Sequence, residues 1–134
     1  MAENINSEVR ERLISGYFQA WVENRPEVLP LTFSTDIVYS ECYGPEYRGL
    51  EQICRWFADW NKKGKVLEWR IKGFLHEGNR TAVEWYFCCE YENEQSGFDG
   101  VSLLEFDSEG KICSLKEFQS KVEHVFPYGE EEKD

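Results

Sequence analysis

Residues 33–49, "FSTDIVYSECYGPEYRG", combine strand-like alternation with an acid in an unusual place. In a β-strand, alternate side chains point to the same face, so Glu41 shares a face with Ile37, Tyr39 and Tyr43. A carboxylate that faces rings and aliphatic carbon loses hydration, and its pKa rises toward the range of a general base. This stretch therefore indicates either a solvated strand end or an acid inside an apolar cavity.

Other kinds of catalytic or metal site have little support in the sequence. His76 and His124 stand on different segments and outside any HxxxH spacing, so we expect no metal site and no Ser/His or Cys/His nucleophile. The five cysteines are irregularly spaced and form no CxxC pair, which indicates reduced structural residues. No phosphate-binding loop or dinucleotide fingerprint is present, so we expect no cofactor.

Composition restricts the partners. The chain has 134 residues, 26 acidic against 15 basic, and a formal net charge of −11. That charge disfavours nucleic acid and anionic membrane surfaces as partners. No apolar run approaches the length of a membrane span and the chain starts with polar residues, so we expect a cytoplasmic protein. Aromatic residues reach 16%, an excess that indicates an interface or a ligand cavity.

The periodicity changes from helical to strand-like along the chain. Apolar residues recur at helical spacing after Ser7, which can cap the first helix, and again between Leu50 and the stop at Gly64. A short element punctuated by Pro26 and Pro30 lies between them. Four segments with a period of two follow, at residues 65–77, 80–92, 99–107 and 110–123.

This order predicts an α+β fold: a curved, cone-shaped, mainly antiparallel sheet covered on one face by about three N-terminal helices. We expect one domain over residues 1–128 and a mobile acidic tail over residues 129–134. Between a strongly bent sheet and its helices, we expect a cone-shaped hollow.

The chain resembles the SnoaL-like and ketosteroid isomerase-like proteins of the nuclear transport factor two-like superfamily. The resemblance runs from about Ser7 to Pro127 and rests on "YFQAW", "FSTDIVYSECYG", "YRGLEQICRWF" and "SLLEFDSEGKICSLKEF". It implies the cone fold and a homodimer formed through the sheet. It leaves function open, since the superfamily includes isomerases, cyclases, dehydratases and non-catalytic binders.

The ketosteroid isomerase branch implies roles for three residues. Glu41 matches the general base, Tyr17 matches the tyrosine that donates to the developing enolate oxygen, and Ser102 matches the second donor. The second donor is a protonated Asp in that branch, so Ser102 is a departure that argues against steroid isomerisation. Glu117 is a second acid directed inward on the last strand, and two nearby carboxylates can serve as acid and base.

Each candidate also has a structural explanation. Glu41 could be a partly exposed acid, Tyr17 a core residue, Ser102 a small strand residue, and Glu117 a solvent or subunit contact. Period and resemblance together predict that the cavity is lined by Tyr39, Tyr43, Phe57, Trp60, Val83, Trp85, Phe87 and Leu115. The aromatic members of this set are expected first of all in the core.

The sequence therefore predicts a domain that binds a small, largely apolar molecule in its cone, with cofactor-free acid/base catalysis as isomerase, cyclase or dehydratase as one use. A non-catalytic ligand-binding domain and a protein-interaction module are the alternatives. Replacement of Glu41 by Gln separates catalysis from simple binding.

Overall fold

The computed structural model describes residues 6–129. The helical part consists of α1 (Ser7–Glu23), a 3₁₀ turn (Pro26–Val28), α2 (Leu29–Thr32) and α3 (Leu50–Lys63). The strands are β1 (Phe33–Ser40), β2 (Glu46–Arg48), β3 (Gly64–Glu77), β4 (Arg80–Tyr91), β5 (Glu94–Phe106) and β6 (Ile112–Ser120). The α+β class predicted from the periodicity is confirmed.

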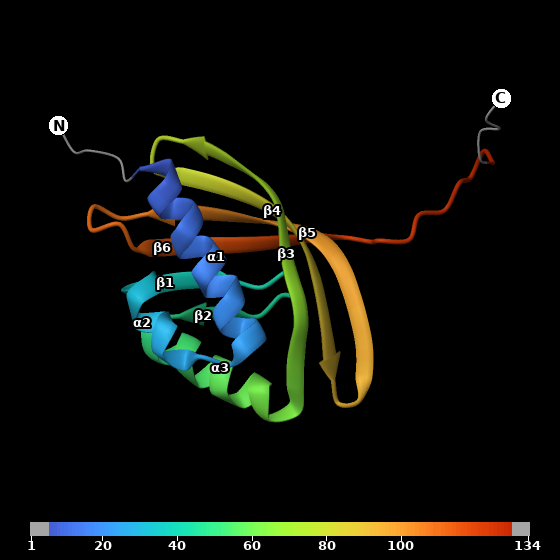
Figure 1. Cartoon of the computed structure of the whole chain (residues 1–134), viewed down its shortest axis with the longest axis horizontal. Helices are drawn as coiled ribbons and strands as arrows, with labels where there is room; N and C mark the ends of the chain where they lie inside the picture. The colour runs from blue at the N-terminus through green and yellow to red at the C-terminus, as the bar shows by residue number, and fades with distance from the viewer. Residues whose placement is uncertain (1–5, 130–134) are drawn as a thin grey trace.

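All the strands join one sheet in the order β2-β1-β6-β5-β4-β3. Strand β1 runs parallel to β6, and every other neighbouring pair is antiparallel. The long strands β3 to β5 bend sharply, and the three helices lie together on the concave side of the sheet (Figure 1). The bend agrees with two register shifts in β3, because such bulges kink a strand and increase its twist.

Aromatic side chains hold α1 against the sheet. The ring of Phe18 stacks on Trp69 of β3 with centroids 3.8 Å apart and planes 3° from parallel. Near the end of the same helix, Trp21 packs against Phe57 of α3 at 4.4 Å. Because long apolar side chains on one helix face meet both the sheet and α3, α1 forms one wall of the cone.

The first helix begins one residue earlier than its sequence suggests. Asn6, not Ser7, is the N-cap, and its side-chain oxygen accepts a hydrogen bond of 2.7 Å from the backbone N–H of Glu8. Asn and Ser are both favourable N-cap residues, so the residue types alone could not predict which of these two adjacent residues caps the helix. The helix ends at Asn24, whose φ of 55° is left-handed.

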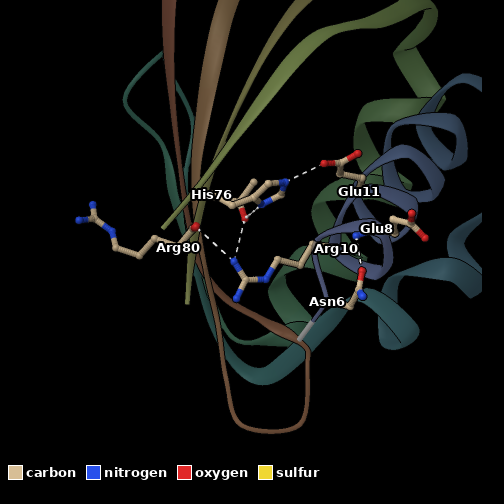
Figure 2. Close-up of polar contacts among 7 residues, drawn as sticks. Asn6, Glu8, Arg10, Glu11, His76 and Arg80 are labelled. Atoms are coloured by element: carbon tan, nitrogen blue, oxygen red, sulfur yellow. Dashed lines mark hydrogen bonds and ion pairs between the residues drawn. The ribbon is translucent and has the colours of Figure 1, made fainter. Parts of the chain in front are cut away.

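A polar cluster fastens the start of α1 to the β3–β4 hairpin (Figure 2). The buried guanidinium of Arg10 donates to the carbonyls of Gly78 and Arg80 and to the hydroxyl of Thr81, at 2.5, 3.3 and 3.4 Å. His76 of β3 lies between Thr81, at 2.9 Å, and Glu11 of α1, at 2.7 Å. These contacts give the buried guanidinium hydrogen-bond acceptors and join the start of α1 to the hairpin.

Two strand boundaries differ from the expected ones. Strand β2 forms within the stretch expected as a turn, and it pairs Tyr47 with Tyr39 of β1. Strand β5 begins at Glu94 rather than Asp99, because Glu92 and Asn93 both take positive φ and close a two-residue hairpin. The first residues of β5 are exposed and polar, so they lack the alternation that would have revealed a strand.

Two observations concern the chain as a whole. From residue 130 onward, the acidic tail expected at 129–134 lies outside the described residues. Across residues 6–129, no helix is both long enough and apolar enough to cross a membrane.

Candidate functional site

A cavity of about 590 Å³ lies between the concave face of the sheet and helices α1 and α3. Its volume is within the range of small-molecule sites. Eleven of the eighteen described residues that line it are aromatic. The lining residues are Trp21, Tyr39, Glu41, Tyr43, Tyr47, Trp56, Asp59, Trp60, Lys63, Trp69, Trp85, Phe87, Cys89, Tyr91, Glu94, Ser96, Phe98 and Glu117.

Glu117 of β6 is the more deeply enclosed of the two acids predicted for the site. Its Oε2 accepts a hydrogen bond of 2.6 Å from the hydroxyl of Tyr39, which in turn accepts one of 2.9 Å from Tyr17. The side chain lines the cavity, and its burial raises its pKa to about 7. The charge of Glu41 raises that pKa further, while the Tyr39 hydroxyl and the Cys42 N–H oppose the rise.

Glu41 follows directly after β1, at a tight turn. Its backbone N–H donates to the carbonyl of Pro45 at 2.9 Å, and its own carbonyl accepts from Gly44 at 3.1 Å. Its Oε1 accepts a hydrogen bond of 2.8 Å from the hydroxyl of Tyr47. Burial raises the pKa of this half-buried carboxyl above its ordinary value, and the Tyr47 hydrogen bond opposes the rise.

The two acids share the wall of one cavity. Two interacting carboxyls ionise one after the other, because the first negative charge disfavours the second. Near neutral pH such a pair can hold one proton between two groups, so that one is a base and the other an acid. The arrangement can therefore both take and give a proton.

Tyr17 and Ser102 lie behind the cavity wall rather than on it. Tyr17 is fully buried, and its hydroxyl donates to Tyr39 instead of pointing into the hollow. Ser102 is also fully buried, and its hydroxyl accepts a hydrogen bond of 2.9 Å from the indole N–H of Trp85. Both therefore hold residues that do reach the cavity.

The structure divides the other residues predicted for the lining into two groups. Phe57, Val83 and Leu115 are buried in the hydrophobic core and do not line the cavity, whereas Tyr39 and Trp85 belong to the same core and also line the cavity. Those on the cavity wall are Tyr39, Tyr43, Trp60, Trp85 and Phe87.

Several aromatic lining residues were missing from the predicted set. Trp69 lies between the two register shifts of β3, where the period of two is interrupted. Tyr47 comes from the unpredicted β2, and its ring stacks on Trp56 of α3 at 4.4 Å. All five tryptophans of the chain line the cavity. The high aromatic content of the sequence is therefore the feature that could have indicated the missing lining residues.

The cavity presents few groups suited to a metal or to an anion. Among residues 6–129, no three His, Cys, Asp or Glu side chains are grouped so as to hold a metal ion. Of the described lining residues, Lys63 is the one basic side chain.

The bent sheet, the three helices on its concave side and the aromatic cavity between them define the ketosteroid isomerase-like class of folds. The profile of the SnoaL-like domain matches residues 14–115, most of the chain, and the chain belongs to that family. None of the curated proteins compared with the chain is similar enough in sequence to count as a match.

Solved structures agree on the fold. A hypothetical protein from Catenulispora acidiphila with a ketosteroid isomerase-like fold, solved in complex with trimethylamine, superposes with a TM-score of 0.72 at 19% identity, over 82% of this chain and 85% of that chain. An LEH-like epoxide hydrolase of M. tuberculosis gives 0.74 at 14% identity, over 83% and 82%. An NTF2-like protein of Burkholderia xenovorans gives 0.72 at 13% identity, over 89% and 95%.

Proposed function

We propose that this protein binds a small, largely apolar molecule in the aromatic cavity and moves a proton on it by cofactor-free acid/base chemistry. The observation that carries the proposal is the pair of carboxyls, Glu41 and Glu117, on the wall of one largely apolar cavity. Burial raises the pKa of both groups. Perturbed titratable groups that converge on a cavity mark functional sites.

In the proposed reaction, ionised Glu117 takes a proton from a carbon next to a carbonyl. The electron pair of that C–H bond moves into an enolate, while the negative charge of Glu41 raises the pKa of Glu117 and so makes Glu117 a stronger base. Return of the proton from Glu117 to another carbon gives isomerisation, while its transfer to a hydroxyl group on the β-carbon, which then leaves as water, gives dehydration. Tyr39 touches Glu117 directly, and Tyr17 acts as a positioning residue through Tyr39.

This assignment differs from the one implied by the resemblance. Glu41 was expected to be the base and Tyr17 the oxyanion donor. A pKa of about 7 places Glu117 within the working range of a general base at neutral pH. The hydroxyl of Tyr17 is already donated within the protein, so it is not available to a substrate.

Deuterium exchange tests the proposal without knowledge of the natural substrate. The probe is 2-tetralone, an apolar ketone with acidic C–H groups, incubated with the protein in D₂O and followed by proton NMR. We expect the wild-type protein to accelerate exchange, and Glu117→Gln to lower that acceleration about 10²- to 10⁴-fold. Glu41→Gln is expected to lower it as well.

The matched control is Glu109→Gln, which removes an exposed acid in the β5–β6 turn. It should exchange as fast as wild type, with all variants checked for an unchanged fold. Equal rates in wild type and Glu117→Gln would contradict the catalytic proposal. They would favour the alternative, a non-catalytic ligand-binding domain with the same cavity.

We further propose a homodimer formed through the convex face of the sheet. Support comes from exposed apolar side chains on that face, such as Leu75 of β3 and Phe118 of β6, which are 76% and 55% exposed. The cytoplasmic location and the absence of a cofactor or nucleic-acid partner stay predictions from composition and motifs.

A further inference from the structure

Aromatic rings from helices α1 and α3 and from strands β3 and β4 line the cavity. Trp56 and Trp60 belong to α3, Trp21 belongs to α1, and Trp69 and Trp85 belong to β3 and β4. Neighbouring rings meet at different angles: Tyr47 stacks on Trp56, whereas Trp69 meets Trp85 edge-on at 5.6 Å. The face of each ring carries partial negative charge, so rings on several sides of a hollow favour a positively charged guest.

Most of the charged side chains that line the cavity are negative, as are the faces of the aromatic rings. Four acids line the cavity against the single base Lys63, a balance of −3 when all of them are ionised. The four acids are Glu41, Asp59, Glu94 and Glu117.

Within residues 6–129, the cavity acids Glu41 and Glu117 have no cationic partner. The side chains of Glu41 and Glu117 accept hydrogen bonds from tyrosine hydroxyls, and no ion pair among the described residues includes either of them. An enclosed carboxylate is stabilised by a positive charge nearby, and here the protein supplies none within the cavity wall beyond Lys63. A cationic ligand would supply that charge, whereas an anion would be repelled.

We propose that the ligand of this cavity is an apolar organic cation, a substituted ammonium compound held by the aromatic rings and by the carboxylates Glu41 and Glu117. The inference rests on the proposed function, because it names the ligand class for the same site. When the cation is bound, one carboxylate pairs with its charge and the other remains available to move a proton. The net charge of −11 also favours the approach of cations from solution.

Three probes of one shape and different charge test the proposal. Choline is the cation, 3,3-dimethylbutan-1-ol is its neutral isostere, and 3,3-dimethylbutanoate is a similar anion. Each is titrated in the millimolar range at neutral pH and constant ionic strength. Binding is followed by intrinsic fluorescence, since all five tryptophans line the cavity, and by calorimetry. We expect choline to bind at least about tenfold more tightly than the alcohol and the anion to bind least.

Variants of the two cavity acids measure what the carboxylates contribute to binding. Glu117→Gln and Glu41→Gln should each weaken choline binding about tenfold or more and leave the alcohol unchanged or more tightly bound. Glu109→Gln should match wild type. The comparison of the three probes on the wild-type protein needs no variant, so it stands even if one variant fails to fold.

The proposal is overturned if the alcohol binds as tightly as choline, if the anion binds best, or if none of the three shows saturable binding. Failure of the proposed function has a different signature. Tight choline binding without Glu117-dependent exchange of 2-tetralone would retain the ligand class and remove the catalysis. Glu117-dependent exchange together with a preference for the alcohol would retain the catalysis and remove the cation.

Discussion

Glu117 is held by donors that lie far apart in the sequence. The hydroxyl of Tyr39 comes from β1, and the charge of Glu41 acts from the turn after that strand. Each influence depends on the parallel pairing of β1 with β6, which aligns Tyr39 with Leu115 and so brings Glu117 close by on the same face. The titration of this one side chain therefore reports on the whole site.

The raised pKa predicts how stability depends on pH. The pKa of Glu117 is about 7 in the folded protein against an ordinary 4.5. As pH rises, the unfolded chain therefore loses the Glu117 proton at a lower pH than the folded protein does. Between these values the folded state binds more protons, and the free energy of unfolding falls as pH rises. The full effect is at most ~3 kcal/mol and is reached above pH 7.

Urea unfolding at pH 5 and pH 8 measures this effect. We expect the wild-type protein to lose stability between the two pH values and Glu117→Gln, which cannot ionise, to lose less. Between pH 5 and pH 8 the difference in the free energy of unfolding should therefore shift in favour of the variant. A variant with the same pH dependence as wild type would show that Glu117 does not titrate in this range.

The sequence placed some site residues and not others for a physical reason. Alternation along one strand correctly predicts that Tyr39 and Ile37 share a face, since that depends only on neighbours in the chain. The partner of a hydroxyl depends on how elements pack. Tyr17 donates to Tyr39, 22 residues away, and Trp85 donates to Ser102, 17 residues away. No local pattern specifies these pairs.

At the scale of elements, the strands follow from period and turn chemistry, whereas the curvature of the sheet does not. Strands β3, β4 and β6 lie close to the predicted segments, because each alternates over a half-buried face. The register shifts in β3 and the short β2 depend on pairing partners, so local patterning did not reveal them. The positions of Trp69 and Tyr47 on the cavity wall were missed for this reason.

Gly100 of β5 lies in close contact with the indole ring of Trp85. It pairs directly with Trp85, and a Cβ there would collide with the indole ring and lie 2.6 Å from the carbonyl oxygen of Phe118. Gly100→Ala should therefore displace Trp85 and lower the free energy of unfolding by about 1–3 kcal/mol. Gly73→Ala in β3 is the matched control, since a Cβ at that position meets no atom within 4 Å.

Urea unfolding and the tryptophan emission maximum check both glycine variants. We expect Gly100→Ala to lose stability and change its emission, and Gly73→Ala to stay close to wild type. If the two variants have equal stability, the contact between β5 and Trp85 does not need a residue without a side chain at position 100.

At the scale of the whole molecule, the helices occupy one face of the sheet and leave the other uncovered (Figure 1). The register of β3 to β6 places apolar side chains on this open face, including Leu75, Val101, Leu103 and Phe118. Just past β6, Val125 and Phe126 are 86% and 58% exposed. A surface of this kind is typical of a protein interface.

The homodimer proposed above predicts a response to charge on the open face. Phe118→Glu places a carboxylate in the middle of the proposed interface, where two copies would desolvate it, so we expect the dimer to dissociate. The control is Leu31→Glu, which changes a 67% exposed apolar residue on α2, on the helical side. Light scattering after size-exclusion chromatography should give about twice 15.9 kDa for wild type and Leu31→Glu, and about 15.9 kDa for Phe118→Glu. A wild-type protein that elutes as a monomer would rule out the dimer, and a Phe118→Glu variant that stays dimeric would place the interface elsewhere. Neither result would affect the proposal for the cavity and its two acids, because they lie on the opposite side of the sheet.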